Sequence, residues 1–177
     1  MPNTNPPQGP PHVPRQPDPP VSAISMLSLI AWSEGTSTSP ITKNDGYDVI
    51  VTGVDGPEVF TDYSDHPFAK GRTAIMVREN PPLFSTASGR YQILLRYWRS
   101  YQQMLNLPDF SPQSQDAVAL RIIYERGALP LLDAGNIEAA IVACSNIWAS
   151  FPGNDYSQGG HSMAELLTQF QNLDSLA

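Results

Sequence analysis

Cysteine is nearly absent from this sequence of 177 residues, since Cys144 is the only one. A single cysteine excludes an internal disulfide and suits maturation in a reducing cytosol. We expect its thiol to be a small buried group rather than a reactive one. The three histidines, His12, His66 and His161, are scattered without metal-ligand spacing, which argues against a zinc amidase or peptidase. We therefore predict a protein without metal or cofactor.

Positive charge is also scarce. Ten Lys and Arg residues stand against 17 Asp and Glu, so the net charge is −7 and the pI about 4.7. An acidic chain without a basic stripe is poorly suited to the phosphate backbone, and we expect no nucleic-acid partner. It also lacks long-range electrostatic attraction to anionic membranes or cell walls, so such a partner would have to be bound through short-range contacts.

Long hydrophobic runs are missing too. The run "VSAISMLSLIAW" (21–32) is too short and too interrupted by polar residues to span a bilayer. A proline-rich segment stands before it, where a signal peptide would carry a basic region. We therefore expect no insertion into a membrane and no export by a leader of its own.

Proline, by contrast, is abundant, and nine of the 18 prolines fall in residues 1–20, "MPNTNPPQGPPHVPRQPDPP". This segment cannot form a helix or a strand ladder, and it offers almost nothing apolar to bury. We interpret residues 1–20 as a disordered or polyproline-like arm. A single globular domain is then expected over residues 21–177.

Strand signals are few within that domain. The runs "GYDVIVTG" (46–53) and "EVFTDY" (58–63) are joined by "VDGP", which predicts one β-hairpin. Residues 64–88 are expected to be mostly connection, with room for a short helix before Pro81. Helical patterns dominate elsewhere, with cap signals at Ser111, Asn136 and Ser162. The expected fold class is α+β, mainly helical, with helices over 22–34, 89–107, 112–127, 137–151 and 163–173.

Glu34 is the residue that most needs an explanation. It ends the first helical pattern and shares the apolar side marked by Leu27, Ile30 and Ala31. Burial and the negative end of the helix dipole both disfavour a carboxylate, so both raise the pKa. A carboxyl that is protonated near neutral pH can act as the general acid that breaks a glycosidic bond. The plainer alternative is a side chain whose tip reaches water or a nearby arginine.

The expected hairpin carries groups that suit a sugar. Tyr47 and Tyr63 offer aromatic faces on which a sugar ring can stack, and Asp48 can accept hydrogen bonds from hydroxyl groups. A helix-borne acid facing a small β-lobe would form a cleft for a glycan. Each of these residues could equally serve packing alone.

Seven strings carry a resemblance to a known family: "AWSEGT" (31–36), "GYDVIVTG" (46–53), "FTDYSDHP" (60–67), "LFSTASGRYQIL" (83–94), "FSPQSQDAVAL" (110–120), "ERGALP" (125–130) and "CSNIWASFPG" (144–153). They resemble, in order, the lambda-type endolysins of bacteriophages. The resemblance runs from about Met26 to the last helix, without the proline-rich head and without "VDGP". It implies a lysozyme-like fold in which a hairpin lobe flanks the active-site cleft.

The resemblance also implies an activity. Lambda-type endolysins are lytic transglycosylases, which cut the bond between N-acetylmuramic acid and N-acetylglucosamine in peptidoglycan glycan strands without adding water. The catalytic glutamate of the family falls on Glu34. The resemblance further implies a monomer that stays in the host bacterial cytoplasm until a holin opens the inner membrane.

Further groove residues follow from the same resemblance. "GRYQ" matches a groove motif, which makes Tyr91 and Gln92 candidate substrate contacts. Asn146 and Trp148 fall where the superfamily places a third groove element. For Tyr91 and Trp148 a place in the core is the alternative, and for Gln92 an exposed helix surface.

Two other functions stay open from the residues themselves. A hydrolytic muramidase would need a second carboxylate, for which Asp45, Asp48 and Asp62 are in the right region. A wall-binding module without catalysis is the other, although such a module would have no need to keep Glu34. Asp62 also belongs to a cluster with Asp65 and His66, which we interpret as a turn before Pro67 rather than as a metal site.

Overall fold

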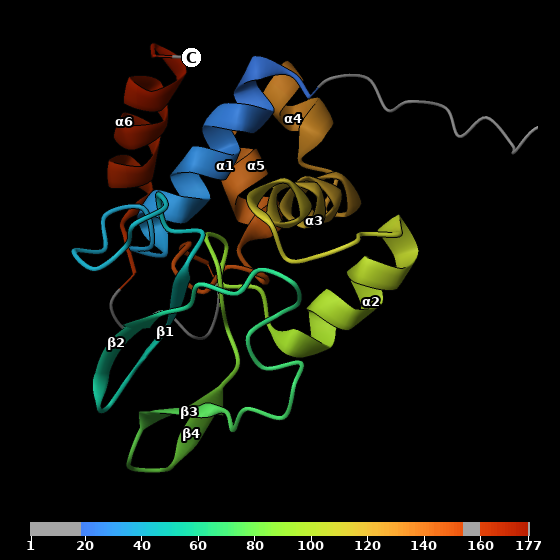
Figure 1. The fold of residues 1–177 in the computed structure, drawn as a ribbon. Coiled ribbons are helices and arrows are strands. Elements are labelled where there is room, and N and C mark those ends of the chain that lie inside the picture. Colours follow the sequence, from blue (N-terminus) through green and yellow to red (C-terminus); the bar gives the residue numbers. More distant parts are fainter. Residues whose placement is uncertain (1–18, 154–159, 177) are drawn as a thin grey trace, which may run out of the picture.

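The computed structural model describes residues 19–153 and 160–176, so most of the proline-rich arm lies outside the described residues. Within them the chain forms a mainly helical body with two small antiparallel hairpins at one end (Figure 1). The expected α+β class, mainly helical, is thereby confirmed. The elements in order are α1 Val21–Ser33, β1 Val49–Gly53, β2 Gly56–Val59, β3 Ile75–Arg78, β4 Leu83–Ser85, α2 Leu95–Leu105, α3 Pro112–Glu125, α4 Leu129–Asp133, α5 Ile137–Cys144 and α6 Met163–Asp174.

Helix α1 forms the centre of the body. It packs against α3, α4 and α6, and Met26, Leu29 and Ile30 are wholly buried. A helix that is apolar nearly all round is stable only when neighbours cover it, and the later helices do so (Figure 1). The helix starts after Pro20 and ends at Ser33, and Gly35, which follows the cap residue Glu34, has the left-handed φ of +70° typical of a residue that terminates a helix.

Local cap signals identified three later helices. Ser111 precedes α3 with Pro112 at its first position, and the Asn136 side chain accepts a hydrogen bond from the Ala139 N–H at the start of α5. Ser162 and Glu165 form a reciprocal capping box at the start of α6. The side-chain caps expected at Asn136 and Ser162 are confirmed, whereas Ser111 has the N-cap position without a side-chain hydrogen bond to the helix.

The second hairpin corrects the sequence analysis. Strands β3 and β4 lie within residues expected to be connection, and no helix precedes Pro81 there. Runs of three or four residues carry too little pattern to distinguish a strand from a loop. The first hairpin supplies the missing support, because β3 lies beside β1 and the Val54 N–H donates to the Met76 carbonyl.

The helix expected over residues 89–107 is also shorter than predicted. It begins only at Leu95, and residues 89–93 form a tight turn closed by hydrogen bonds between Ser88 and Ile93. Gly89 and Gln92 have φ of +76° and +49°, which no α-helix accommodates. Likewise α5 ends at Cys144, so Asn146 and Trp148 lie in a following turn, and the short α4 was not foreseen.

Candidate active site

Glu34 lies at the point where α1 ends and the 36–46 loop begins. It is the C-terminal cap of the helix, and its backbone N–H still donates to the Ile30 carbonyl. Its side chain is half-buried, and Oε1 accepts a hydrogen bond of 2.6 Å from the Ser150 hydroxyl. Ser150 comes from the turn after α5, so the site joins segments 116 residues apart.

The surroundings of Glu34 favour its neutral form. Burial is the largest influence and raises the pKa of the carboxyl above its ordinary value of 4.5. Hydrogen bonds from the hydroxyl and the backbone N–H of Ser150 act in the opposite direction and are weaker than burial. The alternative in which the carboxyl meets an arginine is not what is found, since its partner is a neutral serine.

The loop after Glu34 is held in place by Asp48. This carboxylate is 4% exposed and accepts hydrogen bonds from the Thr42 hydroxyl at 2.5 Å and from the Lys43 N–H at 2.9 Å. Gly46 lets the loop close on itself, because a Cβ there would lie 2.8 Å from the Thr36 carbonyl carbon. Asp48 thus shapes the loop beside Glu34.

Tyr47 and Tyr91 meet on one carboxylate of α3. Their phenol groups donate to Oδ1 of Asp116 at 2.8 and 2.6 Å, and the Arg90 guanidinium lies over the Tyr47 ring. Burial beside Asp116 raises the pKa of Tyr47 to about 12 and that of Tyr91 further still. Tyr91 is 2% exposed, whereas Tyr47 keeps part of its ring at the surface.

Gln115, the residue before Asp116, joins the same two segments. It is fully buried; Oε1 accepts from the Arg90 N–H, and Nε2 donates to the carbonyls of Tyr47 and Phe110. A Cβ at Gly89 would lie 2.1 Å from this oxygen, so the "GR" turn fits only with glycine there. Sequence reasoning missed Gln115 and Asp116, and the one available signal was a polar pair inside the apolar pattern of α3.

The other candidate groove residues differ in how far their side chains are exposed to solvent. Trp148 is 3% exposed and donates from Nε1 to the Tyr91 carbonyl at 3.1 Å, which favours packing. Tyr63 and Gln92 are half-buried, and Asn146 is exposed, so each keeps surface. Tyr63 also accepts a hydrogen bond from Asn44 at 2.9 Å. Contact of these residues with a substrate stays a prediction.

The three aspartates considered for a hydrolase all have other partners. Asp45 pairs with Arg90 at 2.5 Å, and Asp62 pairs with Lys70 at 3.1 Å. Asp48 accepts hydrogen bonds from Thr42 and Lys43 of the loop after Glu34. Within the described part of the chain, none of the three is hydrogen-bonded to Glu34, whose partner is Ser150.

Known proteins resemble this chain along most of its length. A family model described as Endolysin matches residues 24–175. The endolysin of Escherichia phage P2 is 57% identical over 145 residues, which cover 81% of this chain and 87% of the relative. The endolysin of Escherichia phage lambda is 53% identical over 148 residues, which cover 83% of this chain and 87% of the relative.

The chain belongs to the endolysin family. The solved structures agree with the sequences. Bacteriophage lambda lysozyme in complex with a chitohexasaccharide matches with a TM-score of 0.79 and 48% identity, covering 89% of this chain and 97% of that one. A second structure of lysozyme from bacteriophage lambda matches with a TM-score of 0.76 and 46% identity over the same shares. This endolysin therefore has the fold of a cell-wall-degrading enzyme.

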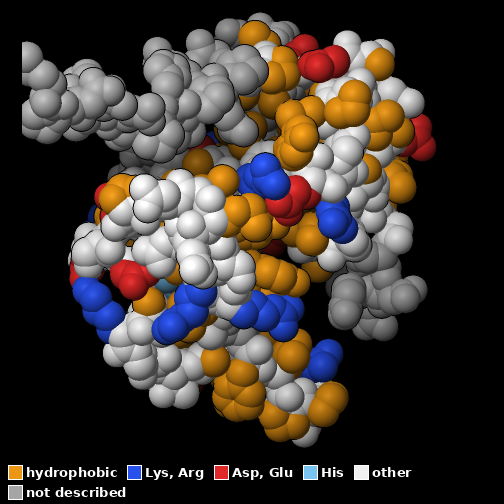
Figure 2. Space-filling model, turned by 90° about the vertical axis from the view of Figure 1, so that its right-hand side faces the viewer, with side chains coloured by type: hydrophobic (Ala, Val, Ile, Leu, Met, Phe, Trp, Pro, Cys, Tyr) orange, Lys and Arg blue, Asp and Glu red, His pale blue; other side chains and the backbone are white. Residues whose placement is uncertain are grey.

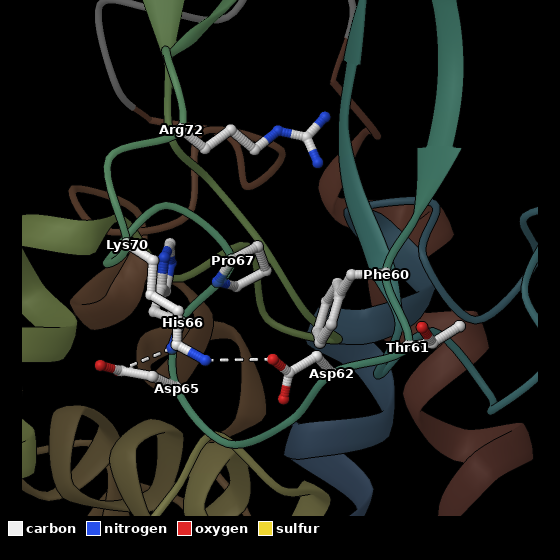
Figure 3. Close-up of a pocket in the computed structure, with 8 residues that line it drawn as sticks. All are labelled: Phe60, Thr61, Asp62, Asp65, His66, Pro67, Lys70 and Arg72. Carbon is white, nitrogen blue, oxygen red and sulfur yellow. Dashed lines mark hydrogen bonds and ion pairs between the residues drawn. The ribbon is translucent and has the colours of Figure 1, made fainter.

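One pocket of this endolysin lies away from Glu34, between the end of β2 and the 61–72 loop (Figure 3). Asp65 there accepts hydrogen bonds from the Trp98 indole N–H and from the His66 N–H. His66 is buried with Nε2 bonded to the Ile93 carbonyl, and burial lowers its pKa to about 4. These residues hold a loop to the core, with a bend at residues 64–65 and a turn at residues 67–70.

An open apolar groove of about 640 Å³ runs between the β3–β4 hairpin and the start of α2. Figure 2 shows hydrophobic side chains gathered at the end of the molecule where this hairpin lies. Leu83 and Phe84 are 46% and 55% exposed there. The groove is lined by Val51, Val77, Leu83, Phe84, Ser85, Thr86, Leu94, Leu95 and Arg96, without Glu34.

Two remaining expectations concern the thiol and the membrane. Cys144 is wholly buried, so the expected packed position is confirmed, and burial raises the pKa of its thiol to about 12, which disfavours the reactive thiolate. Among residues 19–153 and 160–176, every helix is too short or too polar to cross a bilayer.

Proposed function

We propose that this endolysin degrades bacterial peptidoglycan as a lytic transglycosylase, with Glu34 as its single catalytic acid and base. The observation that carries the proposal is the half-buried Glu34 carboxyl at the end of α1, whose pKa burial raises. A neutral carboxyl near pH 7 can donate a proton to a glycosidic oxygen. The chitohexasaccharide bound by the lambda lysozyme relative supports a β-1,4-linked glycan as the ligand class.

The reaction uses one carboxyl twice. Glu34 donates its proton to the oxygen that leaves C1 of N-acetylmuramic acid, and the C1–O bond breaks through an oxocarbenium-like state. The Glu34 carboxylate then takes the proton from the C6 hydroxyl of the same sugar. O6 bonds to C1 and closes a 1,6-anhydro ring, so no water is consumed. An intramolecular hydroxyl has a high effective molarity, and it needs no second carboxylate to activate it.

The positions of the aspartates favour this route over hydrolysis. A retaining or inverting glycosidase needs a second carboxyl across the bond that it cleaves. Asp45, Asp48 and Asp62 are the candidates in the hairpin lobe, and each is bonded to another part of the protein. We propose Tyr47, Tyr63, Gln92 and Asn146 as surface that contacts the glycan strand, since each keeps exposed area.

The deciding experiment is mass spectrometry of muropeptides released from purified peptidoglycan. The wild type is expected to release anhydro-muramic ends, which are one water lighter than reducing ends. Glu34→Gln should lower the release about 10²- to 10⁴-fold, the usual worth of a general acid. Glu138→Gln, which removes an exposed carboxyl at the start of α5, is the matched control and should keep activity. Reducing ends from the wild type would instead establish a hydrolase, and no release would favour a binding module.

We further propose that the protein acts as a monomer that reaches the wall from the host cytoplasm after a holin opens the inner membrane. Expression in a bacterium without phage genes tests this. Intact cells should survive, and chloroform, which permeabilises the inner membrane, should cause immediate lysis. Lysis without chloroform would show that the protein crosses the membrane by itself.

A further inference from the structure

Three close contacts between oxygen atoms lead from Glu34 into the protein. Oε1 of Glu34 lies 2.6 Å from the Ser150 hydroxyl, which lies 2.9 Å from the Ser33 hydroxyl. Ser33 in turn lies 3.0 Å from the Ile30 carbonyl. Each distance is that of a hydrogen bond, and the chain ends on a group that can only accept.

The number of available protons determines which group donates in each of these three hydrogen bonds. Three hydrogen bonds need three protons, and two serine hydroxyls supply only two. The third is available when Glu34 is protonated. The carboxyl then donates to Ser150, Ser150 donates to Ser33, and Ser33 donates to Ile30. With Glu34 ionised, Ser150 turns to donate to the carboxylate, and one of the other two contacts loses its proton.

We propose that Ser150 and Ser33 are positioning residues that hold the Glu34 carboxyl in both of its protonation states. This rests on the proposed function, in which Glu34 is first an acid and then a base. Rotation of one hydroxyl about its C–O bond converts the chain from one state to the other without moving a heavy atom. The carboxyl therefore keeps its place between the two halves of the reaction.

The position of Ser150 is itself fixed. Its backbone N–H also donates to the Glu34 carboxyl. Gly160 packs against the Ser150 backbone, where a Cβ would lie 2.8 Å from the Ser150 carbonyl oxygen. Ser33, on α1, is 8% exposed, so the series of hydrogen bonds from Glu34 through Ser150 to Ser33 leads away from solvent into the protein.

The two serines have opposite effects on the proton of Glu34. Removing the Ser150 hydroxyl takes away a charge-assisted hydrogen bond to the carboxylate, which is stronger than the neutral one that it replaces. Ser150→Ala should therefore move the titration of Glu34 to higher pH. Removing the Ser33 hydroxyl leaves Ser150 without its acceptor only when Glu34 is protonated. Ser33→Ala should therefore move the titration to lower pH.

The experiment is an NMR titration of side-chain carboxyl carbons in protein labelled with ¹³C-glutamate. The Glu34 signal is assigned by its loss in Glu34→Gln. Ser25→Ala is the control, since Ser25 is a buried serine of the same helix that bonds to Asp174 at the far end. It should leave the Glu34 titration where it is. The pH profile of kcat/KM should shift with each titration, and Ser150→Ala should lose up to about 100-fold in kcat through misplacement of the acid.

The outcomes separate this inference from the proposed function. Titrations that move in opposite directions support the serine chain, even if Glu34→Gln proves active and the proposed function fails. If Glu34→Gln is inactive but neither serine variant moves the titration of Glu34, the proposed role of the two serines is wrong and the proposed function stands. If both serine variants shift the Glu34 titration in the same direction, the proposed arrangement of donors and acceptors is also wrong. If Ser150→Ala does not fold, the sign of the Ser33→Ala shift decides alone.

Discussion

The phenol oxygen of Tyr91 lies 2.6 Å from Oδ1 of Asp116, and the same carboxylate oxygen accepts from Tyr47 at 2.8 Å. Asp116 thereby ties the loop before β1 and the turn before α2 to one point on α3. Both segments border the candidate site, so this carboxylate sets their spacing.

The first prediction concerns this tie. Asp116→Ala should lower the free energy of unfolding by about 2–3 kcal/mol, because the phenol groups of buried Tyr91 and half-buried Tyr47 lose a charged acceptor. Asp116→Asn keeps one acceptor oxygen and should lose less. Urea unfolding followed by tryptophan fluorescence measures both. Equal losses for the two variants would contradict the hydrogen-bond argument, because asparagine keeps both the side-chain volume and an acceptor oxygen and lacks only the charge.

The second prediction concerns the stability that Glu34 costs. Its pKa is raised in the folded protein, so the folded state binds more protons than the unfolded state between pH 4.5 and the folded pKa. Stability from this group is therefore complete below pH 4.5 and is lost as the pH rises. Glu34→Gln should be more stable than the wild type at pH 8, with a difference that shrinks toward pH 4.

Thermal unfolding across that pH range checks the second prediction. Glu138→Gln is again the control, because Glu138 is exposed and its removal relieves no burial. A stability gain for Glu34→Gln that does not change with pH would contradict the proposed origin in desolvation of the carboxylate.

The third prediction concerns His66, whose pKa is lowered to about 4 from 6.5. The unfolded state then binds more protons between these values, so stability falls as the pH drops from 6.5 to 4, by about 3 kcal/mol in total. His66→Gln should remove this dependence, although it also lowers stability at pH 7 through lost packing on Phe110. Urea unfolding at intervals between pH 4 and 7 measures it.

His161→Gln serves as the control for His66, because His161 is half-buried and stacks on Trp32 near the surface. It should keep the wild-type dependence over this range. The interpretation fails if His66→Gln unfolds with the same pH dependence as the wild type.

The fourth prediction compares two glycines with left-handed backbone. Gly46 (φ +86°) has the Thr36 backbone against the place of a Cβ, whereas Gly127 (φ +69°) has open space. Gly127→Ala should cost about 1–2 kcal/mol for the left-handed conformation alone. Gly46→Ala should cost more and also lower activity, because the loop after Glu34 must move. Unfolding free energies and muropeptide release measure the two effects, and similar values for both variants would contradict the argument.

Much of the fold follows from local signals in the sequence. Gly35 ended α1, Pro112 opened α3, and Ser162 with Glu165 capped α6, because each signal is satisfied within a few residues. The position of Glu34 at the end of a buried helix followed from the same pattern, and so did the rise in its pKa.

The tertiary structure decided what depends on residues far apart in the chain. Hairpin β3–β4 forms because β1 lies beside β3, and the turn at residues 89–93 is held by Gln115, 25 residues beyond Arg90. Ser150 reaches Glu34 across 116 residues, and no local pattern marks it as a partner. Helix caps and periodicity are short-range properties that a sequence displays directly. Which polar groups meet in the interior is fixed only when the packed helices bring them together.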